Sequence, residues 1–194
     1  MHEATRWTES DLIQVIRGGQ AESVSLEFKS SGALQRNDRN KKELARDVTA
    51  LANSAGGVIV YGIREVDGGR VELDEGVDPG ERYVEWIEDV LSSIQQRIDS
   101  VHVHSVPLET HSSGREAIVV YVPQSPRAPH QAADHRFYKR HGARVLPMEE
   151  YEIRDVSRRQ LACDLHVNVV FGPDLGIPHS ALSGSQVTTR ASPS

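Results

Sequence analysis

Two stretches of sequence decide the fold, AESVSLEFK at residues 21–29 and NSAGGVIVYGIRE at residues 53–65. In the first, apolar residues alternate with polar ones, which is typical of a half-buried strand. Alternation places Glu27 and Lys29 together on the face opposite the apolar side chains. The second stretch has a helix end, a double glycine, and a continuous apolar run at 58–63 that predicts a central strand.

Elements of both kinds are predicted around these two strands. Apolar residues at helical spacing predict helices over 8–16, 41–54, 81–98 and 147–159. Shorter apolar runs and a turn at 67–69 predict strands over 71–73, 101–106, 117–122 and 136–139. The order of these elements favours an α/β fold of the α+β type, with a mixed β-sheet flanked by helices.

Length and composition are typical of one globular domain. The chain has 194 residues, of which 38% are hydrophobic and 26% charged, and no apolar run is long enough to span a membrane. We predict a domain over 1–160 with its core at 12–158, an extension over 161–183 with one more strand, and a disordered tail over 184–194. The first residues lack a secretory signal, and Cys163 is the only cysteine, so we expect a cytoplasmic protein.

Three carboxylates in the two opening stretches are candidate metal ligands. Glu22, Glu27 and Glu65 would suit Mg²⁺ or Mn²⁺ if they converged, and Lys29 would neutralise charge that develops on a phosphate. The alternative is ordinary surface charge. Glu22 can reach the others only if the chain bends or bulges before Val24, because strict alternation puts position 22 on the core face.

Two basic stretches are candidate phosphate contacts, although the formal net charge of the chain is −6. In RFYKRHG at residues 136–142, aromatic and basic residues alternate, a pattern that can stack bases while gripping phosphates. The alternative is a strand with a buried aromatic residue and solvated cations. The predicted nucleic-acid contacts are Arg136, Tyr138, Lys139, Arg140 and Arg144, joined by the weaker candidates Arg39, Lys41 and Lys42. The nine histidines are interpreted mainly as surface residues.

An ordered set of motifs resembles the Schlafen-type AlbA-like (Schlafen AlbA-2) family. The set covers residues 12–158 and runs LEFKSS, LANSAGG, VIVYGIRE, SPRAPH and RFYKRHG. The resemblance implies a compact lobe that binds nucleic acid; in animal members two such lobes form a clamp, and some cut transfer and ribosomal RNA. Their catalytic acids are two glutamates five residues apart and an acid after the glycine-ending strand. These positions match Glu22, Glu27 and Glu65, with Asp67 as an alternate for the third.

The resemblance leads to an expected function with two alternatives. We expect a nucleic-acid-binding domain and a Mg²⁺- or Mn²⁺-dependent endoribonuclease that acts on structured RNA such as tRNA. The alternatives are a non-enzymatic DNA-binding transcriptional regulator and a protein-interaction module. A single lobe would need a homodimer to form a clamp. The zinc ligands of animal members have no counterpart here, and no phosphate-binding loop indicates an ATP site.

Overall fold

The computed structural model describes residues 2–19, 22–66, 70–109, 111, 112 and 114–161. All of them belong to one compact unit, Met1–Ala162. The predicted turn at 67–69, the predicted strand at 165–171 and the predicted tail at 184–194 lie outside the described residues.

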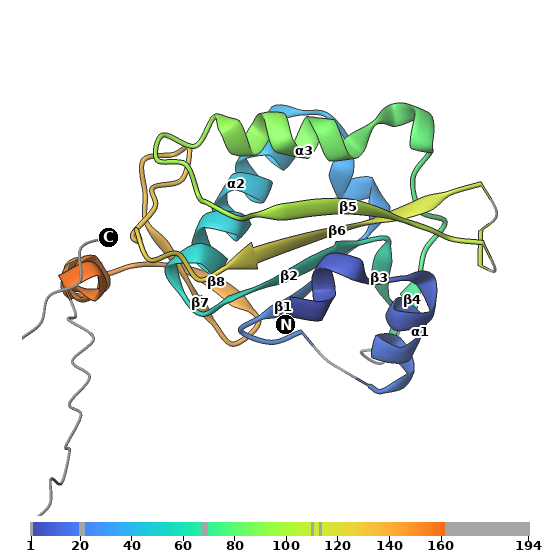
Figure 1. Cartoon of the computed structure of the whole chain (residues 1–194), viewed down its shortest axis with the longest axis horizontal. Helices are drawn as coiled ribbons and strands as arrows, with labels where there is room; N and C mark the ends of the chain where they lie inside the picture. The colour runs from blue at the N-terminus through green and yellow to red at the C-terminus, as the bar shows by residue number, and fades with distance from the viewer. Residues whose placement is uncertain (1, 20–21, 67–69, 110, 113, 162–194) are drawn as a thin grey trace, which may run out of the picture. The chain divides into compact units, whose positions relative to one another are not determined.

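A four-stranded mixed sheet forms the centre of the unit (Figure 1). Its spatial order is β1 (Leu26–Lys29), β2 (Gly56–Tyr61), β6 (Glu116–Pro123) and β5 (His102–Pro107). β1 and β2 are parallel, with Glu27 opposite Ile59, whereas β6 is antiparallel to both β2 and β5. The predicted fold class, a mixed sheet flanked by helices, is therefore confirmed.

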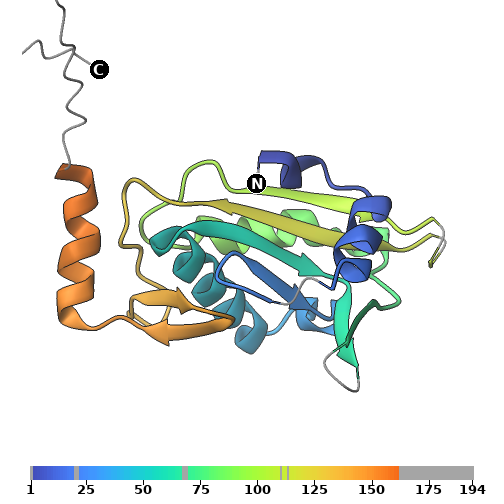
Figure 2. The same ribbon diagram turned by 90° about the horizontal axis from the view of Figure 1, so that it is seen from below.

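The two long helices, α2 (Asp38–Asn53) and α3 (Tyr83–Ser92), cover one face of the sheet (Figures 1 and 2). Their apolar side chains share one buried cluster with the side chains of β2, β5 and β6 that point to this face. Because the side chains of β1 alternate, Glu27 and Lys29 point to the helix-covered face.

The opposite face is covered by N-terminal segments. η1 (His2–Arg6) and α1 (Glu9–Arg17) place Ala4 and Leu12 in a second buried cluster, which also contains Leu26 and Phe28 of β1. Both faces of the sheet are thus buried. The sequence predicted that β1 is half-buried. Instead, α2 lies over the face of β1 that carries Glu27 and Lys29.

Two hairpins and four short helical segments complete the described chain. The hairpins pair β3 (Ile63–Val66) with β4 (Arg70–Leu73), and β7 (Tyr138–His141) with β8 (Arg144–Pro147). Tyr138 and Val145 pack on Ala50 of α2, so the second hairpin lies against the end of that helix. The 3-10 helices η2 and η3 span Ser31–Leu34 and Pro79–Glu81, and α4 (Glu150–Ser157) continues into η4 (Arg158–Leu161).

Local chemistry explains where the observed elements differ from the predicted ones. α2 begins three residues before the predicted start because the Asn37 side chain caps it, accepting a 2.9 Å hydrogen bond from the Asn40 N–H. The structure has β8 at Arg144–Pro147, where the sequence predicted no strand. Gly142, at φ 59°, provides the left-handed residue for the turn between β7 and β8.

Among the described residues, no helix combines the length and apolar character needed to cross a bilayer. The longest described helix, α2, has a charged exposed side, which is described below.

Candidate nucleic-acid interface

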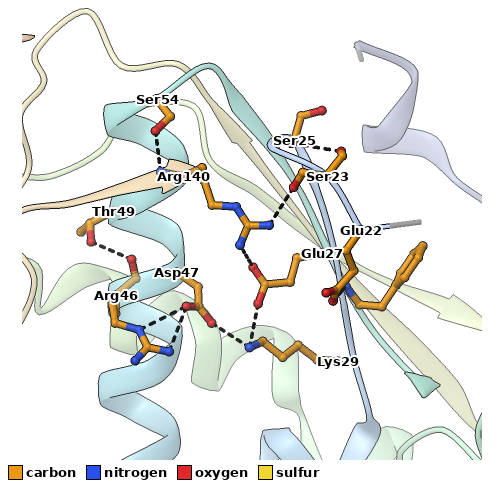
Figure 3. A network of polar contacts seen from close by, with 11 residues as sticks. Glu22, Ser23, Ser25, Glu27, Lys29, Arg46, Asp47, Thr49, Ser54 and Arg140 are labelled. Atoms are coloured by element: carbon orange, nitrogen blue, oxygen red, sulfur yellow. Dashed lines mark hydrogen bonds and ion pairs between the residues drawn. The ribbon is translucent and has the colours of Figure 1, made fainter. Parts of the chain in front are cut away.

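A buried ion-pair network lies between β1, α2 and β7 (Figure 3). Glu27 holds a cation at each carboxylate oxygen: Lys29 Nζ is 2.7 Å from Oε1, and the Arg140 guanidinium contacts Oε2. The Lys29 ammonium also lies 3.0 Å from Oδ2 of Asp47 on α2. The same-face prediction for Glu27 and Lys29 is confirmed, and α2 adds a second carboxylate.

The charges in this network are largely removed from water. The Arg140 side chain is fully buried, and the side chain of Glu27 is 8% exposed. Burial alone would lower the pKa of the Lys29 ammonium, but the Asp47 and Glu27 carboxylates outweigh it and raise that pKa. Burial, with the nearby Glu27 charge, raises the pKa of the Asp47 carboxyl. The cations are therefore held as structural counter-ions.

Arg140 also anchors the β7–β8 hairpin to the sheet. Its guanidinium donates a 2.7 Å hydrogen bond to the Ser23 carbonyl, and its backbone N–H donates a 2.8 Å bond to Ser54 Oγ. One residue thus ties the segment before β1, the end of α2 and the hairpin together. Removing it would leave Glu27 paired with Lys29 alone.

Asn53, in the LANSAGG motif, makes a second anchor at the end of α2. Its side-chain amide donates to the carbonyls of His130 and Tyr138 at 3.0 and 2.9 Å, and its oxygen accepts the His130 N–H at 2.6 Å. His130 is fully buried; its Nε2 lies 2.6 Å from Ser125 Oγ. These contacts fix the proline-containing segment against α2.

Glu22 has a local structural role. The chain bends at residues 24 and 25, where the Ser23 N–H donates a 2.9 Å bond to the Leu26 carbonyl. This bend turns the Glu22 carboxylate back along β1, and not toward a shared site with Glu27 and Glu65. There it accepts a 3.0 Å hydrogen bond from the Phe28 N–H. Val24 is exposed as a result of the bend.

The three predicted metal ligands do not form a common ligand set in the described structure. Glu65 is an exposed residue of the β3–β4 hairpin, and Asp67 lies outside the described residues. In the described part of the chain, no group of three or more His, Cys, Asp or Glu side chains could hold a metal ion. Both Glu27 oxygens already face cations, so the arrangement does not fit a divalent ion.

The predicted phosphate contacts divide into buried and exposed residues. Arg140 and Tyr138 are buried, and Lys139 forms an ion pair with Glu152. The exposed candidates are Arg136, Arg144, Arg39, Lys41 and Lys42. Arg39 lies 3.1 Å from Glu43 in a surface pair that leaves its guanidinium largely in solvent. The exposed group is available to a polyanion, whereas the buried group supports the fold.

Four basic residues form a surface that we call the cationic stripe: Arg39, Lys42, Arg46 and Arg136. The first three lie at spacings of three and four residues on α2 and therefore share one side of the helix. Tyr138 packs on Ala50, which follows Arg46 by four residues on the same side of α2, and Arg136 lies two residues before Tyr138. The stripe thus runs along α2 toward the start of β7.

Comparison with known proteins identifies the family. The family model described as Schlafen, AlbA_2 matches residues 22–149, and the chain belongs to this family. The family is associated with nucleic acid, which gives the chain its general class.

A solved structure shows the same fold. The DIP2311 protein from Corynebacterium diphtheriae matches with a TM-score of 0.52 and 18% sequence identity over 80% of this chain. The match covers 32% of that protein, so this chain spans about a third of its length. No curated protein matches the chain.

Sequence reasoning missed two buried polar residues, Asp47 of the ion-pair network and His130 of the Asn53 anchor. Asp47 stands three residues after Leu44 and four before Leu51, both buried residues of α2, and this spacing could have placed its carboxylate at the edge of the buried side. His130 was grouped with surface histidines. Its burial depends on Asn53, which is 77 residues away in sequence, so no local pattern indicated it.

Proposed function

We propose that the chain binds the phosphate backbone of nucleic acid through the cationic stripe. The observation that carries the proposal is the alignment of Arg39, Lys42 and Arg46 on one side of α2, against which the segment that contains Arg136 packs through Tyr138. Such a row of cations matches the regularly spaced charges of a polynucleotide. The electrostatic attraction acts locally, so a protein with a negative net charge can still bind. Membership of the Schlafen AlbA_2 family supports this class of ligand.

The proposed mode of binding does not require cleavage. Glu27, Lys29, Asp47 and Arg140 balance one another inside the fold, where they position the hairpin beside the cationic stripe. Contacts with phosphates fix a protein on nucleic acid without reading the base sequence. We therefore propose sequence-independent binding, which also suits a DNA-binding regulator whose specificity comes from elsewhere.

A salt titration tests the proposal. Affinity for a labelled oligonucleotide should fall as salt rises, and Lys42→Ala and Arg39→Ala should each lower the slope of log K against log[salt] by about 0.7 to 0.9. Arg70→Ala, at an exposed arginine of β4, is the matched control and should leave the slope unchanged. Equal slopes in the stripe variants and the control would refute the assignment of the surface.

Metal-dependent endoribonuclease activity stays a separate prediction. Its support is the resemblance of Glu22 and Glu27 to the family's catalytic pair, and a metal ion would have to displace the cations that both Glu27 oxygens now face. Incubation of transfer RNA with Mn²⁺ would test it, with wild type compared to Glu27→Gln. Cleavage that needs both Mn²⁺ and Glu27 would support the prediction, and equal RNA recovery in all lanes would reject it.

The predicted homodimer is also a proposal. Two lobes would place two copies of the cationic stripe on one nucleic acid and raise the apparent affinity. Sedimentation of the protein, alone and with an oligonucleotide long enough for two lobes, distinguishes one bound copy from two.

A further inference from the structure

A groove between α2 and α3 opens beside the cationic stripe. It has a volume of about 350 Å³ and is lined by both helices and by Ala133, which precedes β7. This volume lies within the range of about 300–1,000 Å³ that is usual for sites of small organic groups. Lys42 belongs to the groove and to the stripe, so the two adjoin at this residue.

Trp86 of α3 provides an aromatic wall. It lines this groove and also a neighbouring hollow of about 390 Å³ that contains Arg36 and Arg82. The Trp86 ring is only partly buried, and Tyr83 packs against it edge to face at 6.3 Å between centroids. An indole that is fixed by its neighbours and open to a groove is a suitable surface for a flat, apolar ring.

The charges in the groove suit a base attached to a phosphate backbone. Lys41 and Lys42 can contact phosphates, while the carboxylates of Asp38 and Asp89 can accept hydrogen bonds from exocyclic amino groups. A simple anion would meet those two carboxylates unfavourably. A nucleotide in a chain presents both a negative backbone and a neutral ring that carries donors.

We propose that the α2–α3 groove receives an unpaired base, stacked on Trp86, from single-stranded nucleic acid bound along the cationic stripe. The inference rests on the proposed function and specifies its ligand. Bases in a duplex are already stacked and paired, so they cannot enter the groove without the cost of unpairing. The stripe alone would bind single and double strands, whereas the groove adds affinity only for single strands.

Tryptophan fluorescence gives a direct test, because the chain contains only two tryptophans, Trp7 and Trp86. In the full chain with Trp7→Phe, titration with oligo(dC) or oligo(C), whose bases carry an exocyclic amino group, should quench the remaining emission, and a blunt duplex of the same length should not. Stacking is worth about 1–3 kcal/mol per base. Trp86→Leu should therefore weaken single-strand binding by about 5-fold to 150-fold and leave duplex affinity unchanged, while Trp86→Phe should retain most of the affinity.

A second variant separates loss of stacking from loss of folding. Ala133→Leu fills the groove from an exposed position and leaves Trp86 and every charge in place. It should also weaken single-strand binding selectively. Single-strand binding without quenching, unaffected by Trp86→Leu and Ala133→Leu, would overturn the groove and leave the proposed function intact. Absence of binding to either strand form at low salt would overturn both.

Discussion

Replacement of Arg140 by methionine should destabilise the fold strongly, because it removes one partner of a buried ion pair. Such a change typically costs about 3–5 kcal/mol. Glu27 keeps Lys29 at 2.7 Å, and methionine fills most of the apolar volume, so we expect the lower end, about 3 kcal/mol. With a urea slope of about 2 kcal/mol/M, the unfolding midpoint should fall by about 1.5 M.

Two comparison variants make the result specific to the ion pair. Arg136→Met removes an exposed arginine four residues away in sequence and should change stability by no more than about 0.5 kcal/mol. Adding Glu27→Gln to Arg140→Met removes the buried negative charge and should restore at least about 1.5 kcal/mol relative to additivity. A loss below about 1 kcal/mol for Arg140→Met, or strict additivity in the double variant, would refute the reasoning.

Three further predictions concern the supports of the site. Asn53→Ala should cost about 2–3 kcal/mol in urea unfolding because two carbonyls and one N–H lose their buried partner. Burial lowers the pKa of the His130 imidazole, so the unfolded chain takes up the proton first. The contribution of the neutral, buried imidazole to the free energy of unfolding should therefore be complete above about pH 7 and should be lost as the pH falls below about 6.5. A series of thermal melts over this pH range should show a smaller fall in Tm for His130→Gln than for the wild type. Gly57→Ala should cost about 1–3 kcal/mol or more, since its Cβ would lie 2.6 Å from the Ser25 carbonyl oxygen; Gly32→Ala, whose nearest contact is 3.8 Å, should be nearly neutral in the same urea assay.

Local periodicity was enough to predict the central strands and the shared face of Glu27 and Lys29. It could not show what covers that face. The covering group, Arg140, is 113 residues from Glu27 in sequence, and their contact depends on how a hairpin docks on α2. For the same reason, the sequence grouped Arg140 with Arg136 as one basic run. In the structure, Arg140 lies within β7 and is buried, whereas Arg136 lies before the strand and is exposed.

The candidate interface was only partly predictable. Lys42 and Arg39 were identified from charge alone. Lys42 and Arg46 both fall within the helix predicted over 41–54, but the alignment of Arg39 with them depends on the early start of α2 at the Asn37 cap. Trp86 offered no signal beyond its residue type, because the groove exists only where two helices meet. Charge patterns therefore identified the basic residues, but only the tertiary structure showed which of them share a surface.

The hydrogen bond from the Phe28 N–H to Glu22 has a consequence for assembly. β1 is an outer strand of the sheet, and outer strands can recruit a strand from another molecule. Glu22 occupies a backbone donor that such pairing would need and places a negative charge along the edge. Two lobes brought together on one nucleic acid would thus stay separate sheets on the β1 side. Glu22→Ala should make this edge more prone to self-association, which light scattering at rising concentration can detect.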